Sequence, residues 1–298
     1  MKKHLPFLLL LIPVLFLSCR QTSPASGLEK EIREALNQAK GTFAVAFKDL
    51  QSGETLMINS DTVFHAASTM KTPVMIEAFK QAAEGKISLQ DSILVKNEFY
   101  SIVDSSMYQL SVGDDSEEIL YSMIGKKKTL GDLVYDMIIV SSNLATNLVI
   151  DVLGAQDVTA TMRELGAPKI QVLRGVEDIK AYELGLSNTT TAYDLLVIFE
   201  KIANGEAVNK AACKAMIDIL LDQKFNDMIP ALLPEDVQVA HKTGSITGVH
   251  HDSGIVFLPD GRSYVLVLLS KNLEDFDAST QALAGVSRMI YDHVMLKQ

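Results

Sequence analysis

Hydrophobic residues alternate with polar ones, or form short apolar runs, near both ends of the chain, whereas its middle repeats them at helical spacing. Short runs bounded by turn residues are typical of strands, and apolar positions three and four apart indicate helices. The first pattern predicts five strands, and the second predicts a helix near each end. The strands fall at 42–50, 54–60, 237–244, 253–259 and 263–270, and the two helices at 28–39 and 277–294.

The middle of the chain, from residue 68 to about residue 224, is predicted to be mostly helical. One apolar helical stretch runs over 132–153 and stops at Gly154. Thr191 and Asp194 have the spacing of a capping box, which opens a helix expected to end at 204–205. Residues 97–118 have no clean period, so we expect a loop there.

Strands from both ends of the chain, with helices between them, predict an α/β fold of the α+β sandwich type. We expect one antiparallel five-stranded sheet, built from both chain ends and flanked by helices. The mostly helical lobe, over roughly 65–224, is then an insertion. A cleft between two such parts is a usual place for a small-molecule site.

The first eighteen residues have the pattern of an export signal. Lys2 and Lys3 precede an apolar run, 5–17, that is too short to span a bilayer about 30 Å thick. The run ends in "FLSC", which resembles the lipobox of bacterial lipoproteins. The resemblance implies cleavage before Cys19, diacylation of that cysteine and a membrane-anchored protein facing the periplasm. The alternative is an ordinary signal peptide with a chance cysteine. Residues 19–27 would be a tether, and 28–298 the folded domain.

Composition argues against a nucleic-acid partner, an internal disulfide and a metal site. With 48% hydrophobic and 21% charged residues the chain is of the ordinary folded type, and a net charge of −10 argues against a nucleic-acid partner. If Cys19 is lipidated, Cys213 remains alone, so we expect no internal disulfide. His250 and His251 are adjacent, but no third ligand stands at metal-site spacing, so we expect neither a metal nor another cofactor.

The first candidate for chemistry is Ser68-x-x-Lys71, in "HAASTMKTPVM". Residues three apart share one face of a helix. Pro73 is tolerated in the first helical turn, which puts Ser68 at or just before a helix N-terminus, where N–H groups are unpaired. A hydroxyl beside an amine is a possible nucleophile. Alone, the spacing is equally explained by a capping serine and a solvated lysine.

Two further strings are Ser141-Ser142-Asn143, which interrupts an apolar helical run, and Lys242-Thr243-Gly244 with Ser245, which ends a strand. Buried polar residues without partners would be costly, so the first string suggests a helix–helix turn facing a polar cleft. The second offers a cation, hydroxyls and a glycine that permits close backbone approach. The alternative for the first string is the solvent-exposed side of an amphipathic helix, and for the second an edge strand whose lysine prevents pairing with another chain.

In chain order these strings are S-x-x-K, S-x-N and K-T-G, which is the motif set of penicillin-recognising serine enzymes. The sequence between them, including "TPVMIEAFKQAAEGKISL", "SSNLATNLVIDVLGAQDVTATMRELGA" and "NTTTAYDL", also resembles class A β-lactamases and their serine-hydrolase relatives. The resemblance covers nearly the whole chain after the signal.

The resemblance implies a role for each position. Ser68 is the nucleophile that opens the lactam and forms an acyl-enzyme, and Lys71 is its activating base or orients one. Ser141 passes a proton to the departing nitrogen, and Asn143 binds the side-chain amide of the substrate. The carboxylate of the substrate is held by Lys242 and Thr243. Gly244 lets the strand approach, and the backbone N–H groups of Ser68 and Ser245 form the oxyanion hole.

Three positions depart from the class A pattern. Class A enzymes carry a glutamate, the base that removes the acyl group, on a loop before the "TTT" string. Here the candidate is Glu177, with Glu183 second and a solvated loop carboxylate as the alternative. Asn188 stands where an aspartate is usual. Ser142 also replaces an aspartate, which questions the rigidity of the cleft wall.

The function that we expect is hydrolysis of β-lactams by a monomeric, lipid-anchored serine β-lactamase in the periplasm. One alternative is a penicillin-binding-protein-like D-alanyl peptidase that releases antibiotic slowly. Another is a non-catalytic lipoprotein that keeps the fold for binding or sensing; the presence of Ser68, Lys71, Ser141 and Lys242 argues against it.

Overall fold

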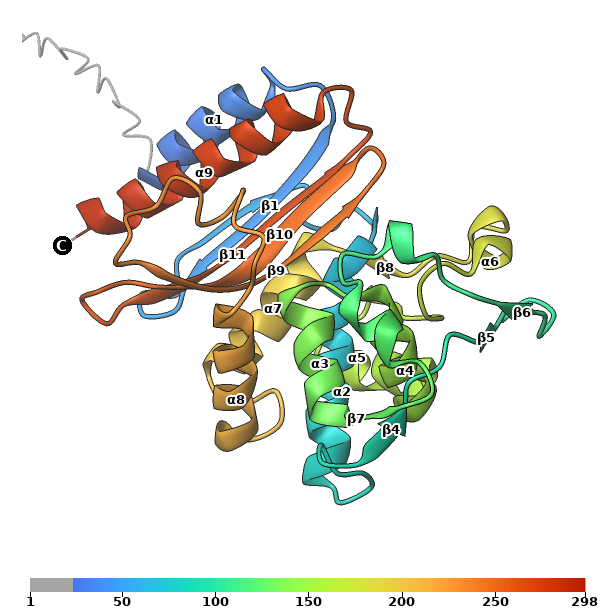
Figure 1. Ribbon diagram of the computed structural model, residues 1–298. Helices are drawn as coiled ribbons and strands as arrows, with labels where there is room; N and C mark the ends of the chain where they lie inside the picture. The colour runs from blue at the N-terminus through green and yellow to red at the C-terminus, as the bar shows by residue number, and fades with distance from the viewer. Residues whose placement is uncertain (1–23, 298) are drawn as a thin grey trace, which may run out of the picture.

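Both ends of the chain build one sheet in the computed structural model, which describes residues 24–297. The sheet is antiparallel, with the order β2-β1-β11-β10-β9, and the sequence prediction of five strands is confirmed (Figure 1). β1 pairs with β11 from Thr42↔Lys271 to Asp49↔Tyr264, so the first and last strands of the chain lie side by side. The strands are β1 (Thr42–Asp49), β2 (Thr55–Ile58), β9 (Gln238–Ile246), β10 (Val249–Phe257) and β11 (Ser263–Lys271).

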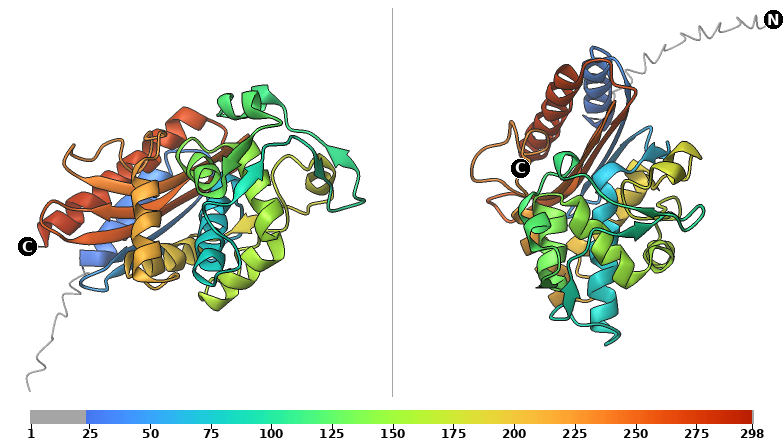
Figure 2. Two further views of the ribbon diagram at one scale, coloured as in Figure 1. Left: turned by 60° about the horizontal axis from the view of Figure 1, so that its bottom comes forward. Right: turned by 45° about the vertical axis from the view of Figure 1, so that its right-hand side comes forward.

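Both faces of the sheet are covered, which explains why β1 and β11 carry long apolar runs. Helices α1 (Pro24–Leu36) and α9 (Phe276–Leu296) lie together on the outer face, as Figure 2 shows from two directions. Val45 and Phe47 point to that side, whereas Ala44 and Ala46 pack against the helical lobe on the other. Successive side chains of a strand face opposite ways, so a sheet buried on both sides needs apolar residues at both parities.

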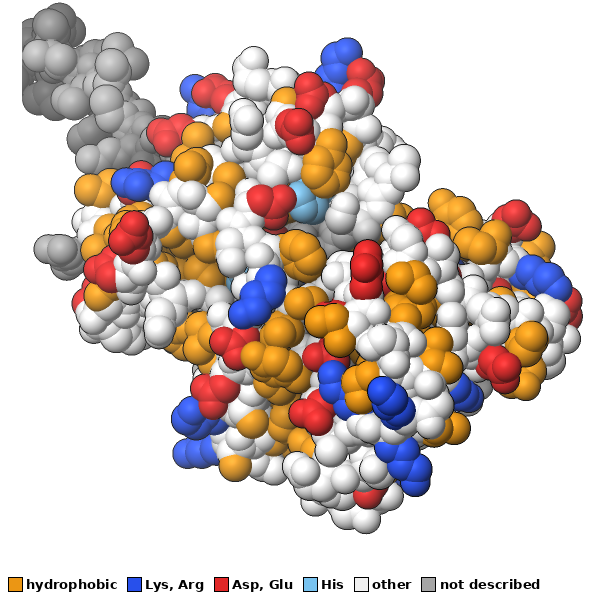
Figure 3. Space-filling model, in the orientation of Figure 1, with side chains coloured by type: hydrophobic (Ala, Val, Ile, Leu, Met, Phe, Trp, Pro, Cys, Tyr) orange, Lys and Arg blue, Asp and Glu red, His pale blue; other side chains and the backbone are white. Residues whose placement is uncertain are grey.

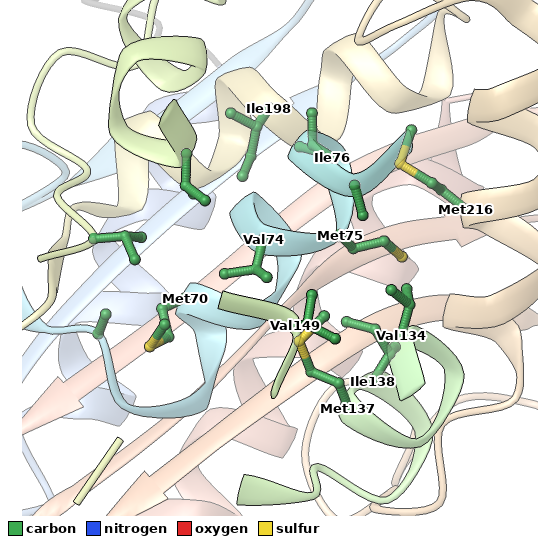
Figure 4. Close-up of a cluster of buried hydrophobic side chains, with 14 of the residues drawn as sticks. Met70, Val74, Met75, Ile76, Val134, Met137, Ile138, Val149, Ile198 and Met216 are labelled. Atoms are coloured by element: carbon green, nitrogen blue, oxygen red, sulfur yellow. The ribbon is translucent and has the colours of Figure 1, made fainter. Parts of the chain in front are cut away.

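The helical lobe is built around α2 (Lys71–Ala83), most of whose residues are buried. Met70, Val74 and Met75 meet side chains from the surrounding helices there (Figure 4). This packing fixes the start of α2 at the boundary between lobe and sheet. The other helices of the lobe are α3 (Leu130–Ile139), α4 (Asn143–Leu153), α5 (Ala155–Glu164), α6 (Ile179–Glu183), α7 (Ala192–Ala203) and α8 (Lys210–Leu221).

Short elements connect these helices. Two 3₁₀ turns, η2 (Val112–Asp114) and η3 (Ile119–Met123), precede α3. Three two-stranded ribbons pair β3 (Phe64–His65) with β8 (Thr189–Thr190), β4 (Ser92–Leu94) with β7 (Lys127–Thr129), and β5 (Phe99–Tyr100) with β6 (Met107–Tyr108). The β5–β6 hairpin lies within the segment predicted as loop, whose few apolar residues gave no strand period.

Several boundaries differ from the predictions. The helical stretch over 132–153 is two helices, because Ser142 leaves the helical conformation and caps α4 by accepting a hydrogen bond from Ala145 N. Thr191 caps α7 as expected, because its hydroxyl accepts a hydrogen bond from Asp194 N. The Asp194 carboxylate does not complete the capping box with Thr191 N; it accepts from Lys169 N and Ile170 N instead. β10 begins at Val249, since Gly248, at φ 71°, allows a two-residue turn from β9.

The N-terminal helix also starts earlier than predicted, at Pro24, within the expected tether, and it ends at Leu36. Proline is well accepted in a first helical turn, because its missing N–H would be unpaired there. The predicted signal peptide (1–18), the predicted lipidation site Cys19 and residues 20–23 lie outside the described residues. Among residues 24–297, no helix combines the length and the apolar character needed to cross a bilayer.

Candidate active site

Ser68 lies in a strained turn at the junction of lobe and sheet. It belongs to the 3₁₀ turn η1 (Ala67–Met70), which leads directly into α2, so Pro73 falls in the first helical turn as predicted. Ala67 has φ 44°, a left-handed conformation that costs an L-residue energy and clusters at functional sites. The turn is held by Thr69 Oγ1, which donates to Ala66 O at 2.6 Å, and by Ala67 N, which donates to His65 Nδ1 at 3.0 Å.

Two cavities meet at Ser68. One, of about 330 Å³, is lined among others by Ser141, Thr243 and Ser245. The other, of about 300 Å³, extends to Glu177 on the opposite side of the serine. The surface of this face is hollowed where lobe and sheet meet, with acidic side chains beside the hollow (Figure 3). A molecule bound at Ser68 therefore has room on both sides.

Lys71 is fully buried one turn after Ser68. Its Nζ donates to Ser141 O at 2.7 Å, to Asn143 Oδ1 at 2.9 Å and to Ser141 Oγ at 3.2 Å, which uses all three protons of an ammonium group. Burial lowers the pKa of Lys71 to about 7, although Asp115 and Glu177 act in the opposite direction. An amine that loses its proton near neutral pH gains a lone pair, and the longest of the three bonds is the one most easily given up.

Lys242 reaches the same hydroxyl from the sheet. Its Nζ donates to Ser141 Oγ at 3.0 Å and to Thr243 O at 2.8 Å. Burial and the nearby charge of Lys71 lower the pKa of Lys242 well below its usual range. Ser141 Oγ thus accepts from two lysines, which leaves its own proton available for donation to a bound molecule.

The break between α3 and α4 places Ser141 and Asn143 at the cavity. Ser141 has φ 57°, and the carboxylate of Asp115 accepts from Asn143 N at 2.9 Å and from Leu144 N at 2.8 Å. A carboxylate at a helix N-terminus pairs orphan N–H groups and complements the helix dipole. The wall is therefore braced at Ser142 in two ways, by the serine cap and by Asp115, although the usual aspartate of this string is absent.

Glu177 faces the same site from the loop before β8. Its Oε1 accepts from Asn143 Nδ2 at 2.9 Å, its φ is 62°, and burial raises its pKa. Glu183, the second candidate, is exposed on α6 and lines neither of the two cavities. The structure therefore brings Glu177 to the site and leaves Glu183 outside.

Two amide side chains hold the Glu177 loop in place. Asn147 accepts from Val176 N at 2.6 Å and donates to Val176 O at 3.0 Å. Asn188 accepts from Leu173 N at 2.8 Å and donates to Arg174 O at 2.9 Å. The amide at position 188, where the class A pattern has a carboxylate, can donate as well as accept, so it clamps backbone at both of its ends.

Gly244 lies where β9 crosses the Ser68 turn. A Cβ at this position would stand 2.9 Å from both Ser68 N and Thr69 N, closer than side chains pack. Absence of a side chain therefore lets the sheet edge and the turn approach, as the sequence suggested. Ser68 and Ser245, whose N–H groups are the expected oxyanion donors, line one cavity with Gly244.

His241, on β9, belongs to a buried cluster of polar side chains. Its Nδ1 lies 2.9 Å from Asp252 Oδ1, and its Nε2 lies 3.1 Å from Asn226 Oδ1. His251 is also buried, with Nδ1 accepting from Ser270 N and Nε2 donating to His65 O at 2.9 Å. The two adjacent histidines, 250 and 251, thus point to opposite faces of the sheet and do not form one ligand set.

Asp115 and Asn147 were missed by the reasoning from sequence. Asp115 stands in a polar segment with five other carboxylates and no period, so nothing marked it out. Asn147 is a lone polar residue in the apolar part of α4, and burial without a partner would be costly. This cost could have indicated from the sequence that the Asn147 amide forms hydrogen bonds in the folded chain.

The chain is similar to known proteins over most of its length. A profile of the Beta-lactamase enzyme family matches residues 27–294. Beta-lactamase CARB-4 of Pseudomonas aeruginosa is 23% identical over 248 residues, which are 82% of this chain and 81% of that protein.

Solved structures give the same picture. PBP-A superposes with a TM-score of 0.80 at 28% identity, covering 91% of this chain and 97% of PBP-A. A mutant of PBP-A was solved as an acyl-enzyme complex with penicillin G. A β-lactamase from Sphaerobacter thermophilus gives a TM-score of 0.77 at 28% identity, covering 90% of this chain and 97% of that one. Since the family profile spans nearly the entire described chain, this protein belongs to the Beta-lactamase enzyme family.

Proposed function

We propose that this protein hydrolyses the amide bond of β-lactam antibiotics through an acyl-serine intermediate, and so gives resistance to them. The observation that carries the proposal is the convergence of Lys71 and Lys242 on one hydroxyl, Ser141 Oγ, at 3.2 and 3.0 Å, in a cavity that also contains Ser68. Membership of the family and the similarity to named β-lactamases support it.

Acylation would use these groups in the following order. The neutral amine of Lys71 takes the proton of Ser68 Oγ, because a hydroxyl is a weak nucleophile until a base accepts its proton. The oxygen attacks the lactam carbonyl carbon, and the N–H groups of Ser68 and Ser245 hold the oxyanion. When the C–N bond breaks, Ser141 gives its proton to the departing nitrogen and regains one from the lysines bonded to it.

Deacylation needs a base for water, and Glu177 is our candidate. Its carboxylate faces the site beside Asn143 and lines the second cavity with Ser68. In the carboxylate form it would take a proton from a water that attacks the ester carbon. The ester C–O bond then breaks, and the leaving Ser68 Oγ takes that proton back, which returns Ser68 to its free form. The alternative, that Glu177 only supports the loop, predicts no change in acyl-enzyme lifetime when it is replaced.

Turnover of a chromogenic cephalosporin by the full chain, purified in detergent, tests the main proposal. We expect hydrolysis by the wild type and none by Ser68→Ala. Equal rates for the two proteins would eliminate the proposed nucleophile.

A second candidate is a D-alanyl peptidase that is only slowly released from penicillin. The similarity to PBP-A, one of whose structures holds penicillin G as an acyl-enzyme, is the observation that favours it. Intact mass after mixing with penicillin separates the two: the proposal expects a rapid return to the free mass, whereas a persistent adduct supports the peptidase. In Glu177→Ala the adduct should last much longer; an unchanged lifetime removes Glu177 as the base.

We also propose that residues 1–18 are an export signal and that Cys19 is acylated, which would place a monomeric enzyme on the periplasmic side of a bacterial membrane. The run of apolar residues and "FLSC" support this proposal. Labelling of cells with a radioactive fatty acid should mark the wild type and not Cys19→Ser; equal labelling would refute it, and gel filtration of the detergent-purified protein tests the monomer.

A further inference from the structure

His65 lies just before the strained turn that carries Ser68. It ends β3, where it pairs with Thr189 of β8. Its backbone oxygen accepts from His251 Nε2 at 2.9 Å, so the five-stranded sheet holds the residue from the other side. Its side chain lines the cavity that extends from Ser68 to Glu177. The proposed acylation and deacylation steps leave this imidazole unused.

The hydrogen bond at the ring of His65 fixes its protonation. Ala67 N, a backbone donor, lies 3.0 Å from His65 Nδ1, so Nδ1 must be the acceptor. A neutral imidazole has one acceptor nitrogen and one protonated nitrogen, whereas an imidazolium ion carries a proton on both. The proton of the neutral ring is therefore on Nε2. Only the neutral ring can hold the Ala67 N–H group, because the cation would turn a second donor toward it.

This bond acts on a residue whose backbone is left-handed. Ala67 has φ 44°, and such a conformation persists only where the surroundings enforce it. The peptide groups that lead into it are both held, since Ala66 N donates to Asn188 O at 2.8 Å and Ala67 N donates to His65. The next N–H group along the chain is that of Ser68, one of the two expected oxyanion donors. Loss of the bond at Ala67 would let the turn relax and move that donor.

We propose that neutral His65 is a positioning residue for acylation, which holds the Ser68 turn in its reactive conformation through the Ala67 N–H group, and that protonation of the ring releases the turn. The inference rests on the proposed function, because Ser68 is the nucleophile of that reaction. The ring exchanges no proton with the substrate in this role and acts through the backbone of the turn. Acylation then needs two groups that have lost their proton, Lys71 and His65.

The charges around the ring set the order of the two protonations. Burial and the nearby guanidinium of Arg174 lower the pKa of His65 below its usual value. The pKa of Lys71 is about 7, so on acidification Lys71 gains its proton first and His65 second. Burial lowers the pKa of His251 to about 4. The other charged or titratable groups around His65 are Tyr182 on α6, Lys271 on β11, and Glu177 and Asp178 in the same cavity.

The test is the pH dependence of kcat/KM for a chromogenic cephalosporin, measured on the full chain between pH 4.5 and 8. This quantity covers binding and acylation, because acylation is the first irreversible step. In the wild type, kcat/KM should fall about tenfold per pH unit once Lys71 gains its proton, and about 100-fold per pH unit once His65 is protonated as well.

Two variants of His65 separate the hydrogen bond from the titration. In His65→Asn the amide oxygen can accept from Ala67 N, as in an Asx turn, but it gains no proton. This variant should stay within about threefold of the wild type at pH 8 and keep the tenfold slope down to pH 4.5. His65→Leu has no acceptor and leaves Ala67 N unpaired, so its kcat/KM at pH 8 should be lower by roughly 10- to 100-fold.

The matched control is His293→Leu, because this histidine of α9 lies against Glu54 on the outer side of the sheet. It should show both acid steps of the wild type. The thermal midpoint is recorded at each pH, so that unfolding is not counted as release of the turn. A tenfold slope throughout in the wild type, a 100-fold slope in His65→Asn, or wild-type activity of His65→Leu at pH 8 would overturn the inference alone. A protein that neither hydrolyses the cephalosporin nor forms a penicillin adduct would overturn the proposed function as well.

Discussion

Replacing Gly244 with alanine tests how the oxyanion site is built. The added Cβ would stand 2.9 Å from Ser68 N and from Thr69 N, and 3.2 Å from Thr69 Cγ2. Ordinary contacts of a Cβ begin near 3.4 Å, so the strand and the turn must separate by about 0.5 Å. Two of the three contacts are backbone nitrogens that no rotamer change can move.

This displacement acts on the donor itself. Ser68 N is one of the two expected oxyanion donors, and the other, Ser245 N, belongs to the residue next to the substitution. Catalytic groups must be held within about 0.5 Å of their productive positions. Loss of one oxyanion donor costs roughly 3–4 kcal/mol, or 100- to 1,000-fold in kcat, and we expect Gly244→Ala to lie in that range.

Steady-state hydrolysis of a chromogenic cephalosporin measures the effect, with the thermal midpoint recorded alongside. Gly285→Ala is the matched control, because an added Cβ there, within α9, meets no atom within 4 Å. It should leave kcat unchanged and stabilise the fold by up to about 1 kcal/mol. A Gly244→Ala enzyme with kcat within twofold of the wild type would show that the close approach does not shape the site.

Three further predictions concern the lobe. Lys71→Arg replaces the amine with a guanidinium that cannot accept a proton. The rate of penicillin adduct formation, followed by intact mass, should therefore fall at least roughly 100-fold, and acylation of Lys71→Arg at the wild-type rate would contradict this. In the wild type, the acylation rate should rise with pH through about 7. Because the pKa of Lys71 is lower in the folded chain than in the unfolded one, the unfolded chain binds more protons between about pH 7 and 10. The stability of the wild type relative to Lys71→Met should therefore rise over that interval in urea melts, and a flat difference would refute the shift. Asn147→Ala removes both bonds to Val176, so it should cost about 2 kcal/mol of stability and prolong the acyl-enzyme; an unchanged lifetime would separate the loop clamp from deacylation.

The fold was predictable because its signals are local. Strands with turn residues between them and helices at 3.6-residue spacing identified the sheet and the lobe. The element boundaries that were predicted wrongly are those that a single residue determines. Ser142 ends one helix and caps the next, and Gly248 shortens a turn by its positive φ. Neither effect changes the hydrophobic pattern over a window of ten residues.

The candidate site was predictable only in part. Ser68 and Lys71 are linked by helix geometry, Ser141 and Lys242 stand in polar strings that interrupt or end apolar segments, and the resemblance supplied the roles of all four. The sequence analysis put Glu177 before Glu183, but the placement of the loop could not be predicted, because it depends on contacts with Asn147 and Asn188.

The pairing of β1 with β11 has a consequence for synthesis. Thr42 and its partner Lys271 are 229 residues apart (271 − 42), so at 5–20 residues per second β1 waits roughly 10 to 45 s for that neighbour. Until then β2 is its sole strand partner among the described elements, and Lys242 has no finished sheet to hold it against the lobe. A chain terminated before residue 271 should therefore have no catalytic activity. The activity measured in a growing cell would then come only from chains whose synthesis is complete.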